Sequence, residues 1–265
     1  MRWKILLIIF VVVVTSGVAV RRFPAVFWAG EKEATLAPTA EISPVMVPEG
    51  KRLVIPAESI QGGETAVREK APESSFIADV PFTVQAPFGE WDDPIFQNGC
   101  EEAALVMAAH WLTGQPLTQD IAKKEIRAIA QFEQKTLGQS IDASVADTEK
   151  IFRGYYGATT SEVRADITLD DMRETLATGA LVIVPADGRK LQNPNYKQPG
   201  PTTHMLVVIG YDAEKKEFIT NDSGTRKGQG YRYPESILFT AIRDYPTGDH
   251  LLIRGTQKDM IIVRK

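Results

Sequence analysis

Residues 99–112 have the sequence GCEEAALVMAAHWL. This segment is rich in alanine, has two acidic residues near its start and is followed by Gly114, so it predicts a helix that begins beside Cys100. Cys100 is the only cysteine of the chain. A single thiol excludes an internal disulfide, an all-cysteine zinc site and a cysteine-ligated iron–sulfur cluster. Cys100 is therefore a structural residue, an intermolecular partner or a nucleophile.

Helices precede strands along the rest of the chain. Three further helices are predicted, at residues 119–135, 143–155 and 169–178. Thr168 or Asp170 is the candidate cap of the last one. Strand-like runs follow at residues 180–184, 203–211, 217–221 and 259–263. Because the strands at 203–211 and 217–221 are joined by a hairpin-length loop, we expect an antiparallel sheet and an α+β fold.

Length and composition limit the number of domains and the class of partner. The chain has 265 residues, of which 43% are hydrophobic and 24% charged, as expected for a globular protein of one or two domains. Apolar periodic segments run from residue 77 to residue 265, which we interpret as one domain. The net charge of -4 leaves no overall basic field, so we expect no nucleic-acid partner.

The N-terminal region predicts export. Residues 5–20 are almost entirely apolar and have Arg or Lys on both sides, which is typical of a signal-anchor or a cleaved signal peptide, assigned to residues 1–28. Residues 29–76 are rich in Pro, Glu and Ala and are interpreted as a disordered linker. We expect the domain to be anchored to a membrane outside the cytoplasm, or secreted.

Cys100 at a helix start has the environment of a reactive thiol. The N–H groups and the positive end of the helix dipole lower the pKa of a cysteine there and are able to stabilise an oxyanion. Glu101 and Glu102 oppose this effect, because their negative charges raise the pKa of the thiol. Free cysteines are also commonly buried and inert. A cationic partner is needed to make Cys100 a nucleophile.

His204 is the candidate partner of Cys100. It begins the apolar run of a predicted core strand, where an imidazole is able to pair with a thiolate and later protonate a leaving group. Asn221 and Asp222 end the next strand of the hairpin, beside the start of the first. Strand alternation lets only one of them face His204. Asp222 is favoured because a carboxylate also stabilises an imidazolium, although an amide is also able to orient the ring.

Four blocks of sequence occur in a recognisable order. They are VPFTVQAPFGEW (80–91), NGCEEAA (98–104), THMLVVIGYD (203–212) and NDSGT (221–225). Together these blocks resemble the C39-like peptidase domains of the papain-like cysteine peptidase superfamily, and they span nearly the whole of the predicted domain.

The resemblance implies a fold and a set of roles. A helix that carries the nucleophile would pack on an antiparallel sheet that carries the histidine and its acidic partner. Cys100 would be the nucleophile, His204 the general acid/base and Asp222 the orienting residue. Gln85 would donate to the oxyanion; because it lies fifteen positions before the cysteine, a longer separation than the family leads us to expect, Gln97 is the nearer alternative.

The remaining histidines and one loop receive weaker assignments. His110 lies about 15 Å along the predicted helix from Cys100 and is interpreted as a packing residue. His250 has no motif around it, and neither a metal site nor a cofactor is expected. The proline-rich loop at residues 193–203 either borders a substrate cleft or is a semi-rigid surface loop.

Two functions follow from these observations. The first is thiol-dependent hydrolysis of peptide bonds by an exported or membrane-anchored cysteine peptidase, with a peptide or protein substrate. The alternative is a catalytically inactive papain-fold module that binds a partner in the cell envelope.

Overall fold

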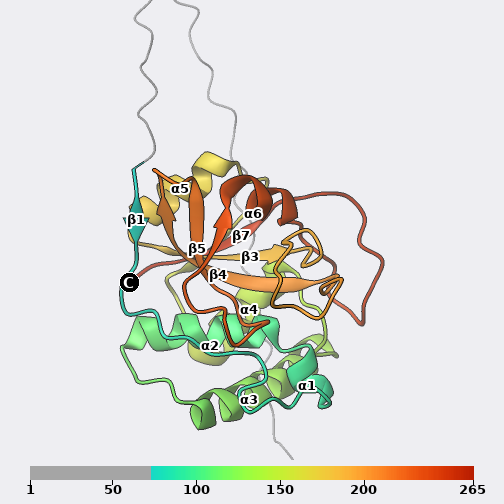
Figure 1. Ribbon diagram of the computed structural model, residues 1–265. Coiled ribbons are helices and arrows are strands. Elements are labelled where there is room, and N and C mark those ends of the chain that lie inside the picture. Colours follow the sequence, from blue (N-terminus) through green and yellow to red (C-terminus); the bar gives the residue numbers. More distant parts are fainter. Residues whose placement is uncertain (1–72) are drawn as a thin grey trace, which may run out of the picture. The chain divides into compact units, whose positions relative to one another are not determined.

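The computed structural model describes residues 73–265 (Figure 1). The predicted signal-anchor at residues 1–28 and most of the predicted linker, residues 29–72, lie outside the described residues. Within residues 73–265, no helix is both long enough and apolar enough to cross a membrane.

The end of the predicted linker is ordered. Residues Ser75–Phe76 form strand β1, which pairs antiparallel with Tyr211 and Gly210 of a central strand. The backbone of β1 approaches Gly210 so closely that a Cβ there would lie 2.6 Å from the Ser75 carbonyl oxygen. The prediction of a disordered linker up to residue 76 is therefore wrong for its last two residues, because they gain backbone hydrogen bonds from the sheet.

One antiparallel sheet forms the centre of the domain. Its strands follow the order β2-β7-β3-β4-β5-β6, and β1 joins β4 outside this path. The strands are β2 (Ser161–Arg164), β3 (Leu181–Ala186), β4 (His204–Asp212), β5 (Glu217–Asn221), β6 (Tyr231–Pro234) and β7 (Met260–Val263). The central strands β3 and β7 are buried along their whole length, as their continuous apolar sequence requires.

Helix α2 (Cys100–Thr113) is the main helix against the sheet. It packs on β4 and on α3, and its residues from Cys100 to Trp111 are all buried. Figure 1 shows α2 and α3 on one side of the strands and α5 on the other. The helix ends at Gly114, whose φ of 66° suits glycine. Because α2 is buried all round, its small alanine side chains allow close packing on both neighbours.

Of the other helices, all but α6 begin at a side-chain cap. They are α1 (Pro94–Gln97), α3 (Gln119–Leu137), α4 (Val145–Tyr156), α5 (Leu169–Ala177) and α6 (Glu235–Ala241). Of the two candidate caps of α5, Thr168 is correct: its side chain accepts from the Asp171 backbone, and the Asp171 side chain accepts from the Thr168 backbone.

The predicted α+β fold is confirmed, and the predicted helices and strands are present with ends that differ by up to two residues. The sequence patterns missed five short elements, β1, β2, β6, α1 and α6. They contain two to seven residues each, too few to show a clear period.

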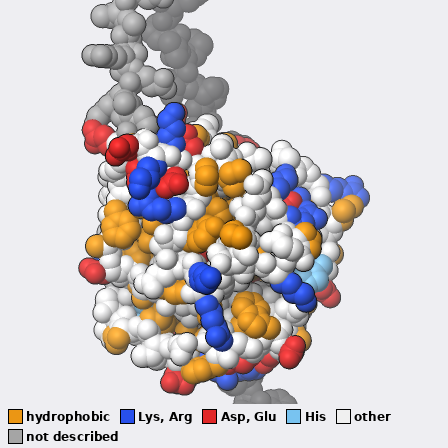
Figure 2. Space-filling model, viewed as in Figure 1, with side chains coloured by type: hydrophobic (Ala, Val, Ile, Leu, Met, Phe, Trp, Pro, Cys, Tyr) orange, Lys and Arg blue, Asp and Glu red, His pale blue; other side chains and the backbone are white. Residues whose placement is uncertain are grey.

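The surface of the described domain has a few large exposed hydrophobic side chains, including Phe76 at 64% exposure and Leu252 at 75%. On the face shown in Figure 2, hydrophobic side chains are interspersed with basic and acidic ones. Neither kind of charge forms one continuous patch on that face.

Candidate active site

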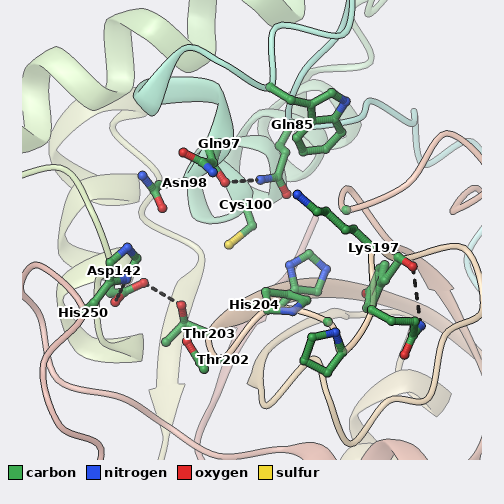
Figure 3. A pocket seen from close by; sticks show the side chains of 17 residues that line it. Gln85, Gln97, Asn98, Cys100, Asp142, Lys197, Thr202, Thr203, His204 and His250 are labelled. Carbon is green, nitrogen blue, oxygen red and sulfur yellow. Dashed lines mark hydrogen bonds and ion pairs between the residues drawn. The ribbon is translucent and has the colours of Figure 1, made fainter.

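A cavity of about 500 Å³ opens beside the start of α2 (Figure 3). Its walls include the residues before and at the start of α2, the start of β4 and residues 196–203 of the loop before β4. The volume lies in the range of about 300–1,000 Å³ that is usual for ligand sites. The proline-rich loop thus borders the cavity, which was one of the two interpretations of its sequence.

Gly99 lets the chain turn from α1 into α2 and places Cys100 at the first helical position. A Cβ at Gly99 would lie 2.9 Å from the Ile95 carbonyl oxygen and 3.2 Å from the Ile126 side chain. Cys100 is only 6% exposed, yet it lines the cavity. Close packing of α1 and α3 at this turn therefore requires glycine before the cysteine.

The Cys100 thiol is in hydrogen-bond contact with a carboxylate. Its Sγ donates to Oε2 of Glu101 at 3.0 Å. Burial, followed by the charge of Glu101, raises the pKa of the thiol well above its usual value, and a backbone hydrogen bond from Met205 acts in the opposite direction. Because Met205 follows His204 in β4, this bond brings the sulfur to the strand that carries the histidine.

His204 and Asp222 form a buried pair on the other side of the cavity. Nε2 of His204 lies 2.8 Å from Oδ1 of Asp222, and the two residues are 2% and 0% exposed. With Nε2 engaged by the carboxylate, Nδ1 is the ring nitrogen left for chemistry. Figure 3 shows the His204 ring and the Cys100 sulfur at the same cavity.

Asp222 is held by several donors besides His204. Its Oδ2 accepts from the hydroxyls of Tyr196 and Tyr233, each at 2.6 Å, and from Nδ2 of Asn193 at 3.2 Å. Burial alone would raise the pKa of Asp222, but the charge of His204 and these hydrogen bonds hold that pKa below its usual value. Asp222 is therefore a fixed anion beside the imidazole.

The sequence did not identify these three supporting side chains. Asn193 and Tyr196 belong to the loop before β4, and Tyr233 lies on the short strand β6. The nearest signal was the proline-rich character of the loop, which indicated a defined shape but gave no function for Tyr196.

Asn221 does not face His204. Its Nδ2 donates to the carbonyl oxygens of Val80 and Pro81 at 3.4 and 3.3 Å, and its Oδ1 accepts from the Gly230 backbone at 3.2 Å. Of the two candidates for orienting the histidine, Asp222 contacts the ring, whereas the Asn221 side chain bonds to the backbone of neighbouring loops.

Two glycines let the segment after β5 close around the pair. A Cβ at Gly224 would lie 3.0 Å from Cε1 of His204, and a Cβ at Gly228 would lie 1.8 Å from the Asp222 carbonyl oxygen. The Gly224 backbone also donates to Oδ1 of Asp222 at 3.0 Å. The Asp222-Ser223-Gly224 block is thus fixed by close backbone approach to the histidine.

Gln85 and Gln97 both line the cavity. The Gln85 amide is buried, and its Nε2 donates to the carbonyl oxygens of Phe96 and Gln97 at 3.2 and 2.8 Å. Its backbone N–H donates to Ser223 at 3.0 Å. Gln85 therefore links, by hydrogen bonds, the segment before Cys100 to the segment after Asp222. The Gln97 side chain is exposed at the cavity edge.

The two other histidines differ in position. His110 is buried away from the cavity, with its ring nitrogens 3.2 Å from the Gln115 carbonyl and from Glu125, in agreement with a packing role. His250, which no sequence motif assigned to a site, lines the cavity, and its Nδ1 lies 3.0 Å from Asp142. In residues 73–265 no group of acidic, His and Cys side chains is arranged to hold a metal ion.

Comparisons with known proteins show which family the chain is similar to. The family model of the Peptidase_C39 like family matches residues 77–245, which include Cys100, His204 and Asp222. Among solved structures, the chain is similar to a candidate C39-like peptidase from Bacillus anthracis, with 12% identity and a TM-score of 0.46 over 73% of this chain and 98% of that one. No curated protein matches the chain.

Proposed function

Because the chain belongs to the Peptidase_C39 like family, we propose that it hydrolyses peptide (amide) bonds with Cys100 as nucleophile. The observation that carries this proposal is the buried His204–Asp222 pair, which borders the same cavity as the only cysteine of the chain. A nucleophile, a base and a group that orients the base are the parts that covalent catalysis requires.

The reaction uses one proton carrier. His204 Nδ1 takes the proton of the Cys100 thiol, and the thiolate attacks the carbonyl carbon of the scissile bond. The imidazolium then gives the proton to the leaving amine, which leaves a thioester on Cys100. A water molecule, deprotonated by His204, attacks the thioester and releases the acid and the free thiol.

Asp222 fixes the histidine for these steps. A carboxylate at 2.8 Å from Nε2 keeps the proton of the neutral ring on that nitrogen, so Nδ1 is free to act as a base. The same charge stabilises the imidazolium once Nδ1 is protonated. Tyr196, Tyr233 and Asn193 prevent the carboxylate from turning away.

The oxyanion of the tetrahedral intermediate has two candidate donors. One is the backbone N–H of Cys100, because the first N–H groups of a helix have no partner within it. The other is the Gln85 amide, whose protons at present point to the Phe96 and Gln97 carbonyls. Gln85 would donate to the oxyanion by exchanging one of these acceptors for it, a bond typically worth about 10²–10³ in rate.

The test replaces the nucleophile. The described domain with Cys100→Ala is expected to lose both hydrolysis of a peptide library and labelling by a thiol-directed peptidase probe. A Cys100→Ser variant replaces the thiol by a smaller hydroxyl group, which is also able to donate to Glu101, and serves as the matched control for folding. Equal hydrolysis by the parent protein and Cys100→Ala would overturn the proposal.

A binding module is the second candidate function. It is favoured by the hydrogen bond from the Cys100 thiol to Glu101 and by the raised pKa of that thiol, which keep the cysteine in its unreactive form. In that case the parent protein would bind peptides of the library without hydrolysing any of them. The Cys100 thiol would be alkylated only at alkaline pH.

We also propose that the domain works outside the cytoplasm. The support is the apolar run at residues 5–20 with its flanking basic residues, followed by the proline-rich segment. Protease digestion of intact and lysed cells is the test, and the domain is expected to be digested, or found in the medium, without lysis. Protection of the domain until lysis would overturn this location.

A further inference from the structure

Glu101 is a buried carboxylate in direct contact with the nucleophile. It is 2% exposed, and its Oε2 accepts from the Cys100 thiol at 3.0 Å. Its Oε1 accepts from the Tyr245 hydroxyl at 2.7 Å and from the Ala143 backbone at 3.3 Å. The carboxylate is thus fixed by donors from two loops, and its second oxygen is aimed at the sulfur.

The two other buried glutamates beside it have a different environment. Neither side-chain oxygen of Glu102 has a hydrogen-bond partner among the described residues. Burial, followed by the charge of Glu133, raises the pKa of Glu102 well above its usual value. Burial, followed by the charge of Glu101, raises the pKa of Glu133 to about 8. Burial thus favours the protonated forms of Glu102 and Glu133, whereas Glu101 accepts hydrogen bonds from Tyr245, Ala143 and the thiol. Glu101 is therefore the member of the trio that is best placed to carry a negative charge.

Several other groups surround this charge. Tyr245 and Asp142 face it from loops, and His204 lies on β4 across the cavity from Cys100. Of the groups named here, only the Tyr245 hydroxyl and the thiol itself donate a side-chain hydrogen bond to Glu101. The causes that raise the pKa of Cys100 are burial, Glu101 and Glu102, and those that raise the pKa of Glu101 are burial and Asp142. The thiol proton is consequently attracted to Glu101, the carboxylate in direct contact with the sulfur.

We propose that Glu101 is a positioning residue that holds the proton of Cys100 and thereby sets the pH range in which this cysteine becomes reactive. The proposal concerns the free protein, so it does not require a substrate. Its consequence for catalysis rests on the proposed function: before the thiol proton passes to His204, the hydrogen bond to Glu101 has to break.

Glu101→Gln is the decisive variant. The Gln oxygen is able to keep the bonds from Tyr245 and Ala143, which leaves the amide N–H₂ facing the sulfur. A charged acceptor of the thiol proton is then replaced by a neutral donor to a thiolate, so both effects lower the thiol pKa. The rate of alkylation by iodoacetamide is measured against pH, and we expect the midpoint to fall by at least about one unit, or tenfold more thiolate below the midpoint.

Two further variants distinguish the effect of the hydrogen bond on the alkylation midpoint from the effect of a nearby negative charge. Glu101→Asp keeps the charge but withdraws the carboxylate by one methylene, so its midpoint is expected between those of the parent and Glu101→Gln. Glu102→Gln is the matched control, because Glu102 is a neighbour on the same helix with similar burial and no hydrogen bond to the sulfur. It is expected to shift the midpoint by less than half as much.

The outcomes separate this inference from the proposed function. An unchanged or higher midpoint in Glu101→Gln, in a protein with parental thermal unfolding, would overturn the inference, as would an equal shift in Glu102→Gln. If Glu101→Gln does not fold, the midpoint of Glu101→Asp decides, and a value at or above that of the parent rejects the inference. Lack of peptide hydrolysis by the parent would reject the proposed function and leave the alkylation result standing.

Discussion

Asp222 and Glu101 are both buried carboxylates that contact a catalytic candidate, yet their surroundings differ. Asp222 accepts from His204, Tyr196, Tyr233, Asn193 and the Gly224 backbone, and its pKa is held below its usual value. Glu101 accepts from fewer donors and lies beside other carboxyl groups, and burial raises its pKa. Both carboxylates are buried, so their pKa values shift in opposite directions because the number of hydrogen-bond donors and the sign of the neighbouring charges differ.

This difference divides the site into a constant half and a titrating half. On the β5 side, the pKa of Asp222 is held below its usual value, so Asp222 stays an anion around neutral pH. On the α2 side, protons are shared among Cys100, Glu101, Glu102 and Glu133, and their positions depend on pH. We expect mutations in the first half to act mainly on geometry and those in the second to act mainly on pH dependence.

Asp222→Ala is expected to have the largest effect. The histidine loses its orienting anion, and two tyrosine hydroxyls and an amide lose their buried acceptor. Peptide hydrolysis should fall by about 10³–10⁴ in kcat, and the unpaired buried groups should lower the free energy of unfolding by a few kcal/mol, at about 1–3 per group. Steady-state kinetics and urea unfolding measure the two effects. Activity above a tenth of the parent would contradict the role of Asp222.

Gly224→Ala tests the geometry of the same half without removing charge. The new methyl group would lie 3.0 Å from Cε1 of His204 and also 3.0 Å from the Tyr196 ring, so the imidazole has to move. We expect kcat to fall by about tenfold to a hundredfold, since displacements of about 1 Å reach the upper end of that range. Near-parental thermal unfolding identifies a local effect. A kcat within twofold of the parent would show that the ring position tolerates this shift.

Glu133→Gln tests the titrating half through stability. The pKa of Glu133 is about 8 in the folded protein and near 4.5 when unfolded, so its contribution is full below about 4.5 and is lost as the pH rises through 8. We expect the free energy of unfolding of the parent to decrease across this window by an amount on the order of a few kcal/mol. Glu133→Gln should flatten the decrease. Glu174→Gln on α5 is the control, because Glu174 is exposed. If the free energy of unfolding of Glu133→Gln decreased with pH as steeply as that of the parent, the titration of Glu133 would not explain the decrease.

Asn221→Ala should have the smallest effect on activity. Asn221 bonds only to backbone groups of loops, so its loss should reduce stability by about 1–2 kcal/mol and change kcat by less than about threefold. Chemical unfolding and kinetics on the same preparation separate these quantities. A loss of kcat equal to that of Asp222→Ala would mean that Asn221 also orients the histidine.

The local parts of the fold were predictable from sequence. The alanine-rich run with Gly114 after it gives α2, and the β4–β5 hairpin follows from two apolar runs with a short polar connection. The same hairpin brings Asp222 toward His204, because the end of its second strand lies beside the start of its first. In each case the residues that decide the structure are close together in the chain.

The parts that were missed depend on contacts between distant segments. Tyr233 supports Asp222 from β6, a strand of four residues whose pattern is too short to read. Glu101 looks like an ordinary acidic residue in a first helical turn, and only the approach of Tyr245, 144 positions later, gives it a buried role. His250 reaches the cavity through a loop contact with Asp142. Such pairings follow from the folded topology and have no local signal.

Strand β4 joins two remote points of the domain. His204 is its first residue, and β1 pairs with Gly210 and Tyr211, about 20–24 Å away at about 3.4 Å per residue. An affinity handle or surface linkage added directly before β1 would therefore meet the domain far from the cavity. Immobilised in that way, the domain would keep its cavity open to macromolecules in solution, so partner capture and turnover are measurable on one sensor surface.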